Sequence, residues 1–314
     1  MKKKLNVLVF GSNGMVGSTL LKVLNKSNKV DKVTGSNRKD TNLFDFEATK
    51  NKIQTLEPDI IINAAARVGG IIANNTQRTE FIMENLKINM NILESSIPYP
   101  NLKIINLGSS CIYPLNAENP ISEDSFMTGT LEPTNSPYAL AKITAIEIGR
   151  SISSQYGHSI LNLMPTNLYG PNDYFSKENS HVIPGLFYRM HNAKLSNDKL
   201  FEVWGSGNPL REFLHVEDLA YSIEFLLDKN LDIDLLNVGS GYEISIRDLS
   251  EKIKKITGFK GEILFDKSRP DGNPKKLLDS SKINSLGWES KISLDQGLMN
   301  TYSWFNENYS TIRV

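Results

Sequence analysis

The sequence predicts an α/β protein built on a doubly wound parallel sheet, with a smaller α/β lobe toward the C-terminus. Three observations lead to this prediction. Short apolar runs at 5–10, 59–63, 102–107 and 159–164 have the length and side-chain types of buried strands. Helical patterns separate these runs, and strands that alternate with helices form parallel sheets. After residue 171 the alternation changes, which predicts a second structural unit.

The overall composition excludes several classes of protein. The chain has 314 residues, with 35 lysines and arginines against 35 aspartates and glutamates, so its formal charge is zero. This balance gives no reason to expect a nucleic-acid surface. No apolar run approaches the ~20 residues of a membrane span, and the single cysteine, Cys111, excludes internal disulfides. We therefore expect a cytoplasmic protein with no metal site, no nucleic-acid partner and no membrane attachment.

The first predicted strand, 5–10, runs directly into a glycine-rich segment. Glycines stand at positions 11, 14 and 17, and a helical pattern of apolar residues follows. A strand, spaced glycines and a helix in this order favour a dinucleotide-binding turn, where a pyrophosphate lies against the helix N-terminus. A glycine-rich turn without a ligand is the alternative. The predicted cofactor contacts are Gly11, Ser12, Asn13, Gly14, Met15, Val16 and Gly17.

The second predicted strand, around 32–34, precedes the residues that choose between NAD and NADP. An acidic residue at this point binds a free ribose 2′-hydroxyl, whereas an arginine suits a 2′-phosphate. Arg38 stands there, and Asp40 follows closely. We therefore predict NADP(H) as the cofactor. Asp40 keeps NAD open as the alternative, and Arg38 could equally be a solvated cation of a loop.

Two later strands are expected to bring small and polar residues to the ligand crevice, because this crevice lies at the carboxyl ends of parallel strands. The strand 59–63 is followed by the small residues 64–70, against which a flat ligand could lie. The strand 102–107 is followed by Ser109 and Cys111. Lone cysteines are commonly small buried hydrophobes. From position alone, a reactive thiol and a buried one are equally supported.

Tyr138 and Lys142 lie about one turn apart in the next predicted helix, so their side chains share a face. An ammonium beside a phenol is expected to lower the tyrosine pKa from its usual ~10. This would make Tyr138 a proton donor and acceptor at neutral pH. The spacing recurs at Tyr99 and Lys103, but prolines on both sides of Tyr99 prevent a regular helix there. An ordinary surface pair is the alternative for Tyr138 and Lys142.

The remaining residues are expected to finish the sheet and to form the second lobe. Glu217 and Asp218 should stabilise the start of a helix through its dipole, and His215 should be structural. The predicted elements are a stiff loop at 165–171, a short helix that opens with 179–184, a strand from 201, a last sheet strand at 235–238, a helix from about 246, a strand at 262–265 and a C-terminal helix. The predicted domains are 1–178 with about 213–243, and about 179–212 with 244–314.

Together these motifs resemble the nucleotide-sugar members of the extended short-chain dehydrogenase/reductase superfamily, and among them the GDP-L-fucose synthase family. The glycine spacing is GxxGxxG, as in the extended enzymes, rather than GxGxxG. Ser109, Tyr138 and Lys142 match the catalytic residues of the superfamily. Family-like stretches extend over nearly the full chain, at 65–75, 108–114, 130–138, 165–171, 179–184, 204–207, 211–218 and 270–272.

The resemblance implies an NADPH-dependent conversion of GDP-4-keto-6-deoxy-D-mannose to GDP-L-fucose, with epimerisation at C3 and C5 and reduction at C4. Cys111 and His181 would be the acid–base pair of the epimerisations, because a thiol and an imidazole both exchange protons near neutrality. Tyr138 would protonate the developing alkoxide while Ser109 donates a hydrogen bond to it. Lys142 would also hold the nicotinamide ribose. A homodimer, formed through helices that include the one with Tyr138, is implied as well.

The resemblance also assigns contacts to the two ligands. Further cofactor contacts are implied at Lys142, Pro165, Thr166, Asn167, Leu168 and His181. Contacts to the GDP-sugar are implied at Arg189, Trp204, Arg211 and Asp271, where an arginine suits a diphosphate. Core packing is the alternative role for Trp204.

Three alternatives stay open. A related enzyme could only reduce C4 or could act on a GDP-heptose, although a pure reductase would need neither Cys111 nor His181. A 4-epimerase or 4,6-dehydratase would cycle tightly held NAD and would need no net reductant. A non-catalytic NADP-sensing protein is the third, because a fold does not determine a function. Such proteins usually lose the tyrosine or the lysine, and this chain keeps both.

Overall fold

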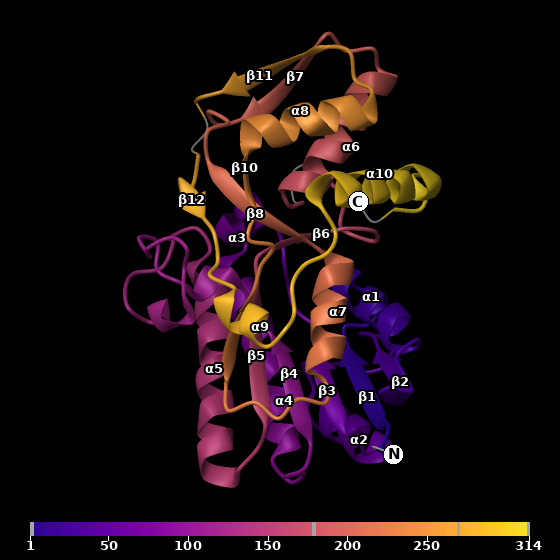
Figure 1. Ribbon diagram of the computed structural model, residues 1–314, viewed down its shortest axis with the longest axis vertical. Helices are drawn as coiled ribbons and strands as arrows, with labels where there is room; N and C mark the ends of the chain where they lie inside the picture. Colours follow the sequence, from indigo (N-terminus) through magenta and orange to yellow (C-terminus); the bar gives the residue numbers. More distant parts are fainter. Residues whose placement is uncertain (1–2, 178–179, 269–270, 313–314) are drawn as a thin grey trace.

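Six strands form one parallel sheet in the lower part of the computed structural model, which describes residues 3–177, 180–268 and 271–312 (Figure 1). The order across the sheet is β2-β1-β3-β4-β5-β9, and every neighbouring pair is parallel. Their bounds are β1 Leu5–Phe10, β2 Val30–Ser36, β3 Ile60–Asn63, β4 Lys103–Leu107, β5 Ile160–Pro165 and β9 Leu235–Val238. The chain leaves β1 and β3 in opposite directions, so these two strands form the switch point where ligands bind in such sheets. The predicted doubly wound sheet is confirmed.

Helices cover both faces of this sheet. One face carries α1 (Met15–Leu24) and α7 (Val216–Leu226), and the other carries α2 (Phe46–Leu56), α4 (Arg78–Ser96) and α5 (Ser136–Tyr156). The inner strands β1, β3, β4 and β5 are therefore mostly buried and largely apolar, whereas the edge strand β2 is partly exposed and carries polar residues. Three short helices complete this part, namely α3 (Ile71–Thr76), the 3₁₀ turn η1 (Ser110–Ile112) and η2 (Glu123–Ser125).

The smaller lobe, in the upper part of Figure 1, is organised around β8 (Leu210–His215). Three short strands pair with β8: β6 (Asn167–Tyr169) and β12 (Lys275–Lys276) in parallel, and β10 (Glu243–Ser245) antiparallel. A separate parallel pair consists of β7 (Leu200–Trp204) and β11 (Glu262–Asp266). The helices of this lobe are α6 (Val182–Leu195), α8 (Ile246–Thr257) and α10 (Leu294–Asn308), whereas α9 (Ser281–Ser285) packs beside β9 of the large sheet.

Each part has its own apolar core, although the chain crosses between them. Phe187, Ile253 and Phe305 belong to the core of the smaller lobe. Ile283 and Trp288, which follow β12 in the chain, pack instead in the core on the α1 and α7 face of the large sheet. The division into two domains at the bounds given above stays a prediction.

Two elements differ from the sequence-based expectations. The predicted loop 165–171 contains β6, because three of its residues pair with the distant strand β8. Asp218 does more than stabilise a helix start: its buried carboxylate accepts backbone N–H groups from Lys291 at 3.1 Å and Ile292 at 2.9 Å. His215 is structural as expected, since it is buried and its Nδ1 accepts the N–H of Glu217.

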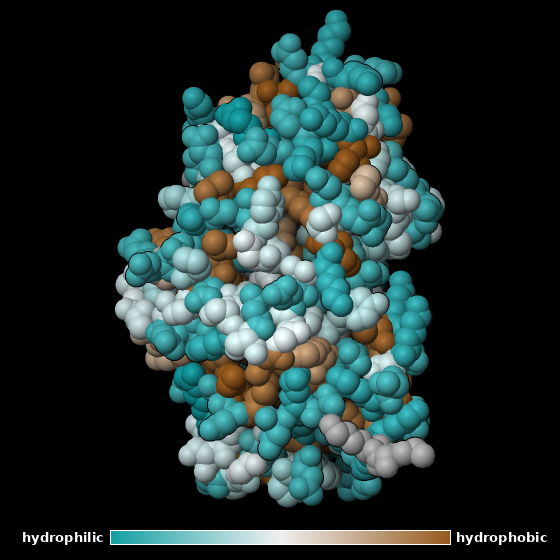
Figure 2. Space-filling view, viewed as in Figure 1, coloured by the Kyte–Doolittle hydropathy of each residue, from teal (hydrophilic) through white to brown (hydrophobic). Residues whose placement is uncertain are grey.

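The surface adds little that would identify a partner. Figure 2 shows hydrophilic side chains over most of one face, with smaller hydrophobic areas across its middle. Within the described ranges, no helix is long and apolar enough to cross a membrane. The same residues contain no group of three or more His, Cys, Asp or Glu side chains that could hold a metal ion.

Candidate active site

The glycine-rich segment forms a tight turn between β1 and α1. Gly11 has φ +78°, and a Cβ atom there would lie 2.7 Å from the backbone of Ala64 and Ala65. A Cβ atom on Gly17 would lie 2.2 Å from the carbonyl oxygen of Gly11. Gly14 precedes α1, whose first turn has no side-chain cap and no acidic residue. The first N–H groups of α1 are therefore available to an anion, and this turn fits the pyrophosphate of a dinucleotide.

The end of β2 carries the residues expected to contact the adenosine ribose. Arg38 is exposed, and its guanidinium lies 5.0 Å from the centre of the Phe44 ring. The carboxylate of Asp40 accepts the backbone N–H of Asn37 at 3.0 Å and so closes its own turn. This arrangement fits a 2′-phosphate at Arg38 better than a 2′-hydroxyl at Asp40.

Ser109, Tyr138 and Lys142 come together at the carboxyl end of β4. Ser109 follows this strand and shares a hydrogen bond with the hydroxyl of Tyr138. Lys142 is buried, and its ammonium donates to the carbonyl oxygen of Leu107 at 2.6 Å. Helix α5 positions the tyrosine and the lysine, because Pro137 in its first turn favours a helix start and the helix packs against η1. The predicted one-turn spacing on a shared face therefore holds.

The pKa of Tyr138 moves opposite to the sequence-based expectation. Burial raises the pKa of its phenol above the usual value, and the neighbouring Cys111 raises it further, while the Ser109 hydrogen bond lowers it in part. The prediction that Lys142 lowers this pKa is wrong, because the ammonium is directed to the carbonyl oxygen of Leu107. Burial also lowers the pKa of Lys142 to about 8. Tyr138 is thus a protonated phenol at neutral pH, ready to donate.

Cys111 lies in the same group, in η1, and is half-buried. Its backbone N–H donates to the Ser109 hydroxyl at 3.2 Å. Two side chains donate to its sulfur: Asn135 Nδ2 at 3.6 Å and Lys276 Nζ at 3.9 Å. Sequence reasoning missed both donors. Asn135 stands just before α5 and Lys276 is in β12, and no local pattern indicates that either one reaches the thiol.

His181 directly precedes α6 with an extended backbone, and its side chain makes no capping hydrogen bond to the helix. Solvent reaches the imidazole, yet the protein around it lowers its pKa below 6.5 by desolvation. It is therefore a neutral base at neutral pH. Its predicted pairing with Cys111 stays a prediction. Asn179, at the start of the family-like stretch 179–184, lies outside the described residues.

The predicted cofactor contacts Pro165, Thr166, Asn167 and Leu168 lie where β5 passes into β6. Thr166 Oγ1 and Asn167 Nδ2 donate to the backbone carbonyl oxygen of Glu212, at 3.2 and 2.8 Å. The buried carboxylate of Glu212 accepts N–H groups from Gly241 at 2.8 Å and Leu278 at 3.0 Å. Glu212 therefore connects the end of the large sheet to the strands of the smaller lobe.

The predicted GDP-sugar contacts lie in the smaller lobe. The guanidinium of Arg189 lies 5.1 Å from the ring centre of Phe201 and 5.3 Å from that of Trp204. Trp204 is 37% exposed, so its alternative role as a core residue is excluded. Burial lowers the pKa of both Arg189 and Arg211, while Glu202 and Asp271 respectively raise it again.

Asp271 has a more indirect position than predicted. Its carboxylate accepts the backbone N–H and the hydroxyl of Ser206, at 2.6 and 2.7 Å. These hydrogen bonds hold its pKa below the usual value, with a smaller contribution from the charge of Arg211. Asp271 thereby fixes the turn that follows Trp204 in β7.

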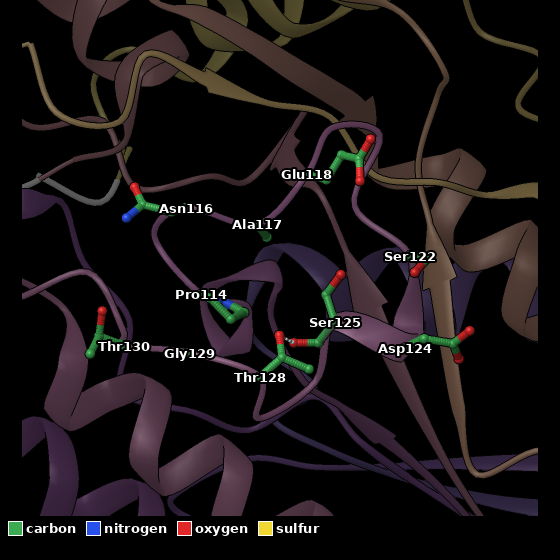
Figure 3. A pocket seen from close by; sticks show the side chains of 10 residues that line it. All are labelled: Pro114, Asn116, Ala117, Glu118, Ser122, Asp124, Ser125, Thr128, Gly129 and Thr130. Atoms are coloured by element: carbon green, nitrogen blue, oxygen red, sulfur yellow. Dashed lines mark hydrogen bonds between the residues drawn. The ribbon is translucent and has the colours of Figure 1, made fainter.

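A hollow of about 460 Å³ opens away from these groups, along the loop that follows η1 (Figure 3). Its lining includes Glu118, Asp124 and Thr128, and none of the predicted site residues line it. The chemistry indicated by the side chains is therefore elsewhere, at the carboxyl ends of the parallel strands.

The arrangement of a nucleotide-binding turn and a Ser-Tyr-Lys group agrees with a comparison against known families. The model of the NAD dependent epimerase/dehydratase family matches residues 7–239. The chain belongs to this family. Among its relatives is GDP-L-fucose synthase of Escherichia coli (strain K12), 43% identical over 99% of this chain and 99% of the relative.

Two solved structures of family relatives cover nearly the whole chain. A GDP-L-fucose synthetase from Naegleria fowleri bound to NADP has a TM-score of 0.92 and 30% identity, over 100% of this chain and 96% of that one. A GDP-mannoheptose C4 reductase from Campylobacter jejuni with NADP bound has a TM-score of 0.86 and 31% identity, over 98% and 99%. The family fold thus spans both parts of the chain.

Proposed function

We propose that this family member converts GDP-4-keto-6-deoxy-D-mannose to GDP-L-fucose, by epimerisation at C3 and C5 and reduction at C4. One observation carries the proposal: the Cys111 thiol lies in the same group as Ser109, Tyr138 and Lys142. The Ser-Tyr-Lys group is sufficient for a reduction, whereas a thiol supplied with two donors serves proton exchange at carbon. The E. coli and Naegleria relatives support this substrate by their names.

NADP(H) is the cofactor that the site would hold. The glycine turn from Gly11 to Gly17 would hold its pyrophosphate, and Arg38 its 2′-phosphate. The strand ends with Pro165, Thr166, Asn167 and Leu168 would lie along the nicotinamide half, together with Lys142 and His181. When bound, NADPH supplies the hydride for the reduction.

The epimerisations depend on the 4-keto group of the sugar. A ketone acidifies the neighbouring C3 and C5 protons, because the resulting negative charge spreads to the ketone oxygen as an enolate. A base removes the proton from one face of the carbon, and an acid returns a proton to the other face. We assign these two roles to Cys111 and His181, without deciding which residue acts at which carbon.

The reduction uses the other group of side chains. As C4 gains hydrogen, its oxygen develops negative charge, and the protonated Tyr138 donates its proton there. Ser109 stabilises this oxygen by a hydrogen bond. In the smaller lobe, Arg189 and Arg211 would bind the diphosphate, Trp204 would contact the guanosine, and Asp271 would hold the turn beside Trp204.

Turnover in deuterated water tests the whole proposal. With GDP-4-keto-6-deoxy-D-mannose, we expect NADPH to be oxidised and deuterium to appear at C3 and C5 of a GDP-L-fucose product. Reduction without deuterium at these carbons would leave a C4 reductase, as the likeness to the C. jejuni GDP-mannoheptose enzyme allows. A GDP-4-keto-heptose assayed in parallel identifies that case directly. No NADPH oxidation with either sugar would favour the sensing role.

We also propose a homodimer that forms through α4 and α5. These neighbouring helices each expose one stripe of side chains, which includes Met83 and Met90 on α4 and Leu140 on α5. Two such helix pairs can cover each other as a four-helix bundle. By light scattering, we expect a dimer mass for the wild type and for Met299→Glu, which changes an exposed methionine of α10, and a monomer mass for the double variant Met83→Glu/Met90→Glu. A monomeric wild type would contradict this.

A further inference from the structure

The side chain of Lys276 reaches across from the smaller lobe to the only cysteine of the chain. The ammonium of Lys276 lies 3.9 Å from the sulfur of Cys111. Lys276 belongs to β12, which is far in sequence from η1, where Cys111 lies. In β12 it is the register partner of Arg211 on β8. Paired residues of neighbouring strands share a face of the sheet. The lysine therefore belongs to the face that also carries a proposed diphosphate contact.

The backbone around Lys276 is fixed rather than loose. The next residue, Leu277, donates its N–H to Asn119 Oδ1 at 2.8 Å, and Leu278 donates to the Glu212 carboxylate at 3.0 Å. Asn273 Nδ2, three residues earlier, donates to the carbonyl oxygen of Leu115 at 3.2 Å. These hydrogen bonds hold β12 against the loop that follows Cys111. The backbone that carries Lys276 is thus held close to the loop that begins at Cys111.

The side chains of Lys275 and Lys276 make different contacts. The ammonium of Lys275 forms an ion pair with Glu243 at 3.0 Å. For Lys276, no carboxylate within the described ranges lies at ion-pair distance. The groups that face the sulfur are Asn135 and Tyr138 from the α5 side and Lys276 from β12. Asn135 and the protonated Tyr138 are neutral, so Lys276 is the charged group in this set.

We propose that Lys276 is a positioning residue for proton exchange at carbon: it orients Cys111 and balances the charge that forms on its sulfur. When the thiol protonates the enolate, its S–H bond breaks, a C–H bond forms at the sugar carbon, and the negative charge passes from the enolate to the sulfur. An ammonium nearby stabilises this thiolate. The inference deepens the proposed function, since it rests on the acid–base role of Cys111.

Alkylation of the single cysteine tests this without any substrate. The rate with iodoacetamide is measured from pH 6 to 10 by intact mass, for the wild type, Lys276→Met, Lys276→Arg and Lys275→Met. Because a nearby ammonium stabilises the reactive thiolate, we expect the alkylation rate near pH 8 to be several-fold lower in Lys276→Met than in the wild type. Lys276→Arg should stay near the wild type. Lys275→Met removes the same charge one residue away and should be alkylated at the wild-type rate.

A second measurement connects the thiol to the chemistry. Deuterium uptake at C3 and C5 should fall at least about tenfold in Lys276→Met and recover in Lys276→Arg. An alkylation profile of Lys276→Met that coincides with that of Lys275→Met overturns the proposal, whatever the substrate. A different outcome would be slower alkylation of Lys276→Met together with no deuterium uptake by the wild type. This outcome would support the Lys276–Cys111 contact and would refute the epimerase role. Thermal melting shows whether each variant is folded.

Discussion

Replacing Tyr138 by phenylalanine is expected to reduce NADPH oxidation with GDP-4-keto-6-deoxy-D-mannose by roughly 10²- to 10⁴-fold, the usual contribution of a general acid. Burial raises the pKa of this phenol, so it carries its proton throughout the neutral range and can give it to the C4 oxygen. The substitution removes one hydroxyl and retains the ring, which packs edge-on against Phe81 at 6.3 Å. Binding of NADPH, followed by fluorescence, should stay within about twofold.

The same experiment has a matched control in the chain. Tyr99 also precedes a lysine by four residues, but it follows the end of α4 and lies outside any helix, away from the active site. Tyr99→Phe should oxidise NADPH at the wild-type rate. If Tyr138→Phe and Tyr99→Phe were equally active, Tyr138 would not be the acid of the reduction.

Replacing Cys111 by alanine is expected to reduce deuterium uptake at C3 and C5 by roughly 10²- to 10⁴-fold. The thiol is the group in this cluster whose proton is proposed to exchange with the sugar carbon, and alanine cannot replace it. Because the reduction uses Tyr138 and Ser109, the variant should still bind NADPH and reduce the unepimerised 4-keto sugar slowly. Product analysis by NMR separates the two outcomes.

The serine variant sharpens this second prediction. Cys111→Ser keeps a small hydrogen-bonding side chain between Asn135 and Lys276, but a hydroxyl is a far weaker acid than a thiol. It should therefore lose deuterium uptake almost as fully as Cys111→Ala. Wild-type uptake in the serine variant would mean that the side chain at this position only fills space, and that another group carries the proton.

The inner strands of the large sheet were predictable because burial on both faces makes them largely apolar. The sequence 60–63, for example, is Ile-Ile-Ile-Asn, and all four residues are buried. The short strands of the smaller lobe carry no such signal. The three residues of β6 and the two of β12 are strands only because β8 lies beside them, and β8 is built from a distant part of the chain.

Some residues of the candidate site were likewise predictable from local sequence, and others were not. Gly11, Ser109, Tyr138 and Lys142 were predictable, because each stands at a strand end or on a helix face that the sequence reveals. Lys276 was not, since its distance from the sulfur depends on how two lobes meet. The pKa of Tyr138 was mispredicted for a related reason. Spacing places the lysine on the same face as the phenol, but only the fold shows that Leu107 takes the ammonium and that burial dominates.

The hydrogen bonds of Glu212 determine how the molecule can deform. Its backbone carbonyl accepts hydrogen bonds from Thr166 and Asn167, which directly follow β5. Its carboxylate accepts the N–H groups of Gly241 and Leu278, which lie beside the strands that flank β8. Separating Glu212 from these partners would leave buried polar groups without hydrogen bonds, at a cost of about 1–3 kcal/mol each. The hydrogen bonds of Glu212 therefore oppose local separation of β8 from the end of β5 and from the segments that flank it.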